Sequence, residues 1–266
     1  MTNDNREGCD QAANDNAAPK LGREVATRQL PRRFYTDAGF EYGEGGYVIT
    51  LDGRQVKTPK KATLKVPTRP LAKALVEEWR AQVEVVDPEA MPLTRLSNTA
   101  IDRVHGREGE IVDEIVRYAE SDLLCYRASS PAGLVAMQSA AWDPVLRWAE
   151  QTLDAKLRLG EGIVHVAQPG HAIGHVRDAI AKLDAFGLTA LHNMTTLTGS
   201  CVLALALAHG VLEPQAAWRA AHVDEDWQIS QWGEDGEAAD RRERRWREFE
   251  AAHRFLNLAQ SGETAG

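Results

Sequence analysis

The sequence predicts an α+β fold, in which a small antiparallel β-rich N-terminal domain is followed by a mainly helical C-terminal domain. In the segment GYVITLDGRQVKT, the side chains of Tyr47, Ile49 and Leu51 alternate with their neighbours, and this period of two is typical of a strand. From Thr68 on, apolar residues recur every three or four positions, as they do in amphipathic helices. After about residue 130 the helical pattern continues almost without interruption.

The two ends of the chain differ in composition from the rest. Residues 1–30 are rich in Asn, Asp, Ala and Gln, and their apolar residues show no period, so we expect a disordered tail. The predicted organisation is a tail over 1–30, a β-rich α+β domain over 31–130, a helical domain over 131–258 and a flexible tail over 259–266.

Turn residues divide the β-rich domain into strands. The pair Asp52-Gly53 predicts a two-residue hairpin turn, because both turn positions need positive φ. ATLKVP predicts a third strand, which Pro67 ends. Together with RRFYTDAGFEY upstream, these segments predict a small antiparallel sheet.

Helix signals begin directly after the sheet. Thr68 can cap a helix and Pro70 can occupy its first turn. One apolar stripe follows, made of Leu71, Ala72, Leu75, Val76, Trp79 and Val83. Further helices are predicted over 92–104, 107–120, 133–153 (two helices if Pro144 begins a new one), 171–184, 188–210, 214–235 and 237–258, with a short strand over 162–169.

Charge and cysteine content exclude several classes of protein. The net charge of −8 argues against nonspecific nucleic-acid binding. Cys9, Cys125 and Cys201 are far apart and odd in number, which predicts neither a disulfide framework nor a zinc site and fits a reducing compartment. We find no apolar run of membrane-spanning length and no signal-peptide pattern, so we expect a cytoplasmic bacterial protein without membrane insertion.

Four patterns could carry chemistry, and each has a plainer structural explanation. His171 and His175 have the i,i+4 spacing of zinc proteases, but Ala172 stands where the glutamate would follow, which favours two surface histidines. TLTGSC lies in an apolar helix, so Cys201 is expected to be an inert core thiol. GEGGYV precedes a strand and favours a turn, and the mixed charges of RRERRWRE favour an exposed helix. We therefore predict no catalytic, cofactor-binding or metal-binding residues.

The segment VDEDWQISQWGED combines five carboxylates with two tryptophans. In a helix of about 100° per residue, Trp227 and Trp232 would point roughly 140° apart, so both cannot enter one core. The successive carboxylates of Asp224, Glu225 and Asp226 fan around the axis, whereas a catalytic pair must aim at one point.

A polar strip on the same helix suggests a different use. Asp224, Gln228, Gln231 and Asp235 would lie between the two indoles, where they could form hydrogen bonds with a partner protein beside an exposed tryptophan. A solvated helix face with two core-facing indoles is the alternative.

Several separated segments resemble, in order, the F1-ATPase assembly chaperone family that is specific for the alpha subunit. The similarity runs from about Arg32 to Leu258. It is carried by RRFYTDAGF, GYVITLDGRQVKTPKKATLKVPT, ALVEEWRAQ, DPEAMPLTRLSNTAIDRV, SDLLCYRA, AAWDPVLRWAE and DEDWQISQWGED. TPKKATLKVPT is more basic than the family pattern.

The resemblance implies a chaperone that binds the unassembled alpha subunit of the ATP synthase F1 sector and prevents its aggregation until it pairs with beta. It also implies an N-terminal β-rich domain, a C-terminal helical domain and no enzymatic activity. We expect a monomer without cofactors. The alternative is a metal- or carboxylate-dependent hydrolase. The residues predicted to bind the partner are Asp224, Glu225, Gln228, Gln231, Trp232, Glu234 and Asp235.

Overall fold

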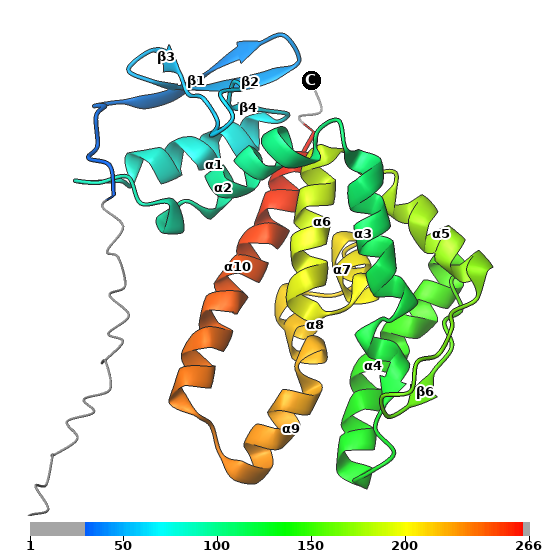
Figure 1. Ribbon diagram of the computed structural model, residues 1–266. Coiled ribbons are helices and arrows are strands. Elements are labelled where there is room, and N and C mark those ends of the chain that lie inside the picture. The colour runs from blue at the N-terminus through cyan, green and yellow to red at the C-terminus, as the bar shows by residue number, and fades with distance from the viewer. Residues whose placement is uncertain (1–29, 263–266) are drawn as a thin grey trace, which may run out of the picture. The chain divides into compact units, whose positions relative to one another are not determined.

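The computed structural model describes residues 30–262. The predicted N-terminal tail, apart from Leu30, and the last four residues of the predicted C-terminal tail lie outside this range, as does Cys9. From Pro31 on, the described residues belong to one unit. They begin with a small antiparallel sheet and continue as helices, which confirms the predicted α+β class (Figure 1).

The sheet is built around its second strand. β2 pairs antiparallel with β1 along its whole length on one side, and with β3 and β4 on the other. The Asp52-Gly53 hairpin is confirmed, since both residues have positive φ, 47° and 75°. The Asp52 carboxylate also accepts hydrogen bonds from the backbone N–H groups of Thr36 and Asp37, at 3.0 and 2.8 Å, and so fixes the chain that enters β1. The strands are β1 (Ala38–Gly43), β2 (Gly46–Leu51), β3 (Arg54–Gln55) and β4 (Lys65–Val66).

Helix α1 (Arg69–Arg80) packs against β1 and β2 of the sheet. As predicted, the Thr68 hydroxyl caps it by accepting from the Leu71 N–H at 3.3 Å. The predicted stripe is buried from Leu71 to Trp79, but Val83 is 79% exposed because the helix ends at Arg80.

Nine further helices follow among the described residues. The last of them, α10, lies alongside α6 and reaches α1 and α2 with its C-terminal part (Figure 1). There the Thr68 hydroxyl donates to the Leu258 carbonyl at 2.5 Å, which joins the start of α1 to the C-terminal part of α10. The helices are α2 (Pro92–Thr99), α3 (Glu108–Glu120), α4 (Ala132–Leu153), α5 (Gly170–Ile180), α6 (Ala185–Thr198), α7 (Cys201–Ala208), α8 (Pro214–Ala221), α9 (Val223–Trp232) and α10 (Gly236–Gln260).

Shorter turns and two short strands complete the described chain. A π-helical turn extends α2, so the helix predicted over 92–104 is regular only in its first part. The predicted strand over 162–169 is wrong, because the strand lies earlier and pairs in parallel with β5. These elements are the 3₁₀ turns Pro88–Ala90 and Leu123–Cys125, the π-helical turn Ala100–Val104, β5 (Tyr126–Arg127) and β6 (Gly160–Glu161).

Two of the predicted long helices are divided. Gly199 adopts a left-handed conformation and Ser200 caps a new helix, so the apolar segment 188–210 forms α6 and α7. The segment predicted as one helix over 214–235 breaks at His222 into α8 and α9, and α9 ends before Gly233. By contrast, α4 continues through Pro144 as one helix.

A buried carboxylate holds the start of α7. Asp122 is fully buried, and it accepts hydrogen bonds from the N–H groups of Leu124 and Val202, at 3.1 and 3.0 Å. Burial raises its pKa to about 6. Cys125 and Cys201 are the sequence neighbours of Leu124 and Val202, and both thiols are buried. Burial raises the pKa of each thiol, as expected for inert core residues.

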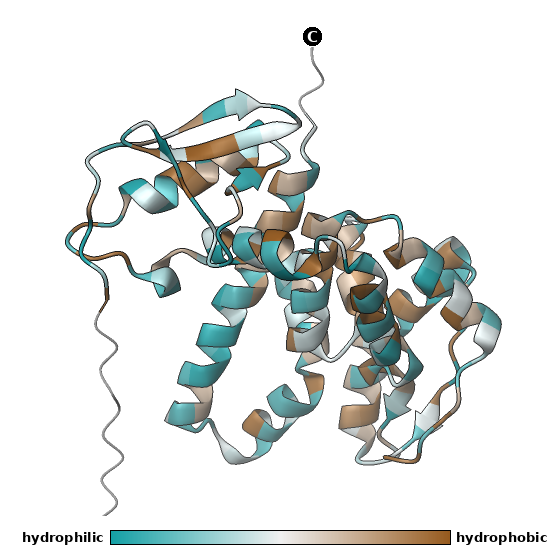
Figure 2. Ribbon diagram, turned by 45° about the horizontal axis from the view of Figure 1, so that its top comes forward, coloured by the Kyte–Doolittle hydropathy of each residue, from teal (hydrophilic) through white to brown (hydrophobic). Residues whose placement is uncertain are grey.

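Apolar residues face the interior of the helical layers, and polar residues cover their outer faces (Figure 2). Helix α7 is apolar all round, because other helices enclose it. Among residues 30–262 no helix combines the length and the apolar character that crossing a bilayer requires.

Candidate functional site

The segment that contains Trp227 and Trp232 forms α9 and the turn into α10. His222 is buried at the start of α9, and its Nδ1–H donates to the Trp218 carbonyl at 2.7 Å. Burial lowers the pKa of His222, because an apolar environment disfavours the charged ring. At the other end Gly233, with a φ of 88°, ends α9, and the Asp235 carboxylate caps α10 by accepting from the Ala238 N–H at 3.1 Å.

The two tryptophans of α9 point to different surroundings, as their spacing predicts. Trp227 is half-buried against Gly133 of α4, where a Cβ added to the glycine would lie 2.5 Å from the indole. Trp232 is 80% exposed. One indole therefore attaches α9 to the fold, and the other faces solvent.

Two acidic side chains of α9 are used inside the molecule. Asp224 accepts a hydrogen bond from the amide of Gln138 at 2.6 Å, and Gln138 is itself buried in α4. Asp226 forms an ion pair with Arg242 of α10 at 2.6 Å, in a partly buried position. These contacts fix α9 to its neighbours on two sides.

A hollow of about 270 Å³ lies between α9 and the start of α10. Trp232 and Ile229 supply apolar wall, and Glu225, Gln228 and Glu234 supply hydrogen-bond acceptors. It is lined by Glu225, Gln228, Ile229, Trp232, Gly233, Glu234, Asp235, Ala238, Ala239 and Arg242.

Five of the seven residues predicted to bind a partner meet at this hollow, and Asp224 and Gln231 do not. The continuous polar strip that we expected on one helix is wrong in its geometry, because Gly233 ends α9 and Asp235 belongs to the cap of α10. Gln231 is exposed, and its amide donates to the Ser230 hydroxyl at 3.1 Å.

Sequence reasoning missed the α10 side of this surface. A second hollow, of about 550 Å³, shares Glu234, Ala239 and Arg242 with the first and extends to Trp218 and Trp246. The positions 239, 242, 243 and 246 have helical spacing and therefore share one face of α10. That spacing could have indicated the face, but not that α8 and α9 lie opposite it. We call the two hollows together, including Trp232 in the wall of the first, the α9–α10 surface.

Comparison with known proteins identifies the family. Residues 32–150 match the family model described as ATP12 chaperone protein. The fission yeast protein named "Protein atp12, mitochondrial" is 25% identical over 214 residues, which cover 76% of this chain and 74% of that protein. The crystal structure of Atp12 from Paracoccus denitrificans superposes with a TM-score of 0.83 at 40% identity, covering 86% of this chain and 99% of that one. The chain belongs to the ATP12 chaperone family.

A second solved structure is similar over most of both chains. It is a putative chaperone from Agrobacterium tumefaciens, which is 46% identical, has a TM-score of 0.84 and covers 91% of this chain and 92% of that one. The resemblance read from the sequence is confirmed, and with it the function of an assembly chaperone of the F1-ATPase. None of these matches supports the hydrolase alternative.

The other sequence patterns have structural explanations in this ATP12-family chain. His175 Nδ1 lies 2.9 Å from the Asp154 carbonyl, which fastens α5 to the end of α4. No group of three or more His, Cys, Asp or Glu side chains within residues 30–262 could hold a metal ion. In α10, Arg247 pairs with Glu243 at 3.0 Å along the helix, whereas Glu248 lies 3.8 Å from Arg95 of α2.

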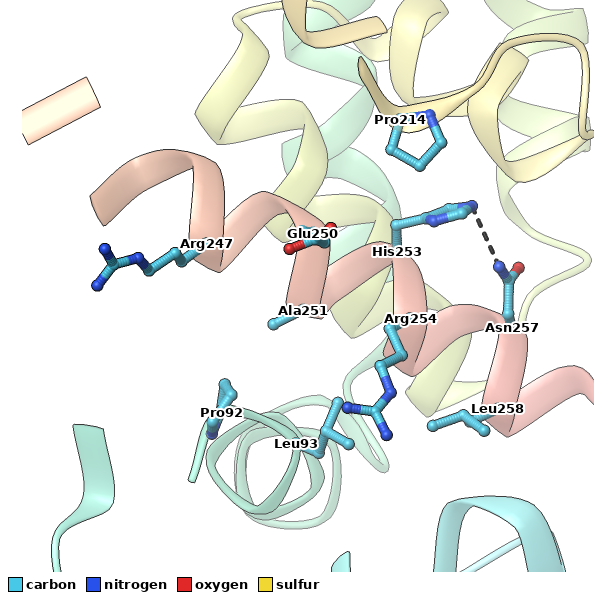
Figure 3. Close-up of a pocket in the computed structure, with 10 residues that line it drawn as sticks. All are labelled: Pro92, Leu93, Pro214, Arg247, Glu250, Ala251, His253, Arg254, Asn257 and Leu258. Carbon is cyan, nitrogen blue, oxygen red and sulfur yellow. Dashed lines mark hydrogen bonds between the residues drawn. The ribbon is translucent and has the colours of Figure 1, made fainter. Parts of the chain in front are cut away.

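Another hollow, of about 650 Å³, lies where α10 passes α2 and the start of α8 (Figure 3). The amide of Asn257 points to the His253 ring, with Nδ2 and Nε2 3.1 Å apart. Arg254 lies beside Leu93 and Leu258, away from that pair (Figure 3). The polar groups of this hollow do not converge on one point, so it lacks the arrangement of an acid–base site.

Proposed function

We propose that this protein binds the unassembled alpha subunit of the F1 sector through the α9–α10 surface, as a monomer and without catalysing a reaction. The binding prevents aggregation of alpha until beta takes its place. The observation that carries the proposal is Trp232, which is 80% exposed on a helix whose opposite side is fixed to α4.

The fixed position of α9 favours this use of its exposed side. Because Trp227 and Asp224 hold the helix against α4, little conformational freedom is lost when a partner covers Trp232. Exposed tryptophans beside acceptor side chains have the composition of binding hot spots. Glu225, Gln228 and Glu234 would accept hydrogen bonds from backbone N–H groups or basic side chains of alpha.

The release of the alpha subunit also follows from binding by ordinary side-chain contacts. An unassembled subunit exposes a large interface that aggregates unless it is covered. A chaperone that covers part of this interface by ordinary side-chain contacts is displaced when the true partner binds the same surface more tightly. This mechanism requires neither a cofactor nor nucleotide hydrolysis.

Co-expression of the tagged protein with the alpha and beta subunits tests the proposal. We expect wild type to capture alpha that is not yet paired with beta, and Trp232→Ala to capture at least tenfold less, because a hot-spot residue contributes about 2 kcal/mol or more. Glu225→Lys should also weaken capture. Tyr42→Ala is the matched control, since Tyr42 is a 76% exposed aromatic residue on the β1 strand.

Two results would contradict the proposal at different levels. If wild type never captures unassembled alpha, the proposed partner is wrong. If wild type captures alpha and Trp232→Ala does so equally well, alpha remains the partner but the α9–α10 surface is not its binding site.

A further inference from the structure

The loop between α4 and α5 exposes a pair of adjacent apolar residues. Ile163 is 99% exposed and Val164 is 71% exposed, and Leu159 in the same loop is 52% exposed. Single exposed apolar residues are common on protein surfaces and need no explanation. All three lie in this one loop, and the adjacent pair Ile163 and Val164 forms an apolar tip that the rest of the described chain leaves largely exposed.

The base of this loop is held firmly. The Gln168 side chain accepts from the Arg158 N–H at 2.8 Å and donates to the Arg158 carbonyl at 3.0 Å, which closes the loop. Strand β6 pairs with β5, and the Gly162 N–H donates to the Arg127 carbonyl at 2.9 Å. Arg127 is in turn ion-paired with Asp143 of α4 at 2.7 Å. The apolar tip is therefore presented on a fixed support.

Helix α4 connects this loop to the α9–α10 surface. Trp227 and Asp224 attach to α4 at Gly133 and Gln138. The loop is linked to α4 indirectly, because Gly162 binds Arg127 and Arg127 pairs with Asp143. At 1.5 Å per residue, the ten residues from 133 to 143 span about 15 Å of helix. Positions 138 and 143 differ by roughly 140° around the axis, so α9 and the loop flank α4. Both lie at the same end of the described fold (Figure 1, Figure 2).

We infer that the tip formed by Ile163 and Val164 is a second anchor for the client, and that it inserts into an apolar recess of the interface that unassembled alpha exposes. The inference rests on the proposed function. A client that lies across the end of α4 contacts Trp232 on one side of the helix and the tip on the other. An apolar tip that is already ordered in the free protein adds affinity, because little conformational entropy is lost when it binds.

The test uses the full chain and measures its affinity for purified unassembled alpha subunit. We expect the double variant Ile163→Ser/Val164→Ser to bind alpha about 10- to 100-fold more weakly, as expected for the loss of two buried apolar side chains. Val83→Ser is the matched control, since Val83 is 79% exposed and lies after α1, and it should bind within about twofold of wild type. Both variants should melt at the wild-type temperature.

Three results would overturn the inference. If the double variant binds alpha as wild type does while Trp232→Ala binds more weakly, the tip is not an anchor and the proposed function stands. If Val83→Ser weakens binding as much as the double variant, the effect is not specific to the tip. If wild type is a dimer by light scattering and the double variant is a monomer with unchanged affinity for alpha, a second copy of the chain covers the tip instead.

Discussion

Replacement of Gly133 tests how α9 is held. A Cβ at this position would lie 2.5 and 2.7 Å from two indole atoms of Trp227, far closer than van der Waals contact. Gly133→Ala therefore forces the indole, and with it α9, away from α4. Overpacking of this kind typically costs about 1–3 kcal/mol. The gain in helix propensity, up to about 1 kcal/mol, offsets part of that cost.

A second glycine separates these two effects. Gly174 lies in helix α5, and a Cβ there would meet no atom within 4 Å. Gly174→Ala thus gains propensity without a clash, and the difference between the two variants approximates the overpacking cost. In equilibrium urea unfolding we expect Gly133→Ala to be about 1–3 kcal/mol less stable than Gly174→Ala, or about 2–10 °C lower in melting temperature. If the two variants are equally stable, the tight contact between Gly133 and Trp227 is refuted.

Three further changes probe other contacts. Asp235→Ala should lower stability by about 1 kcal/mol in urea unfolding, because α10 loses its cap, and Asp235→Ser should restore most of the loss; equal losses would contradict a capping role. A double-mutant cycle on Asp226 and Arg242 should give a coupling of about 0.2–1 kcal/mol, whereas zero coupling would show that the ion pair does not hold α9 to α10. Burial raises the pKa of Asp122 to about 6 from an ordinary value near 3.8, so the folded state binds its proton more tightly than the unfolded chain. Its contribution to stability is therefore largest at low pH and falls by at most about 3 kcal/mol as pH rises from about 4 to 6. Unfolding curves of wild type and Asp122→Asn across this range should diverge with that sign, and parallel pH profiles would contradict it.

Structural features that depend on residues close together in the chain could be predicted from the sequence. The Asp52-Gly53 turn and the Thr68 cap depend on the conformation of neighbouring residues, and both are as predicted. The division of the apolar segment 188–210 was not predicted. It depends partly on Asp122, which holds the start of α7 from a distant position in the chain.

The candidate site shows the same limit. Helical spacing predicts that Trp227 and Trp232 point apart, because this follows from the geometry of one helix. Which indole is covered depends on Gly133, and the role of Asp224 depends on Gln138, and both of these residues come from α4. No pattern within α9 contains that information.

The hydrogen bond between Thr68 and Leu258 joins residues that are 190 positions apart. During synthesis the sheet, α1 and α2 leave the ribosome long before α10 exists, so the apolar surfaces that α10 covers must wait for the end of translation. Contacts of such long range slow folding, because the intervening chain must be ordered before they form. An assembly chaperone of the F1-ATPase thus leaves part of its own apolar surface exposed until its last helix has been made.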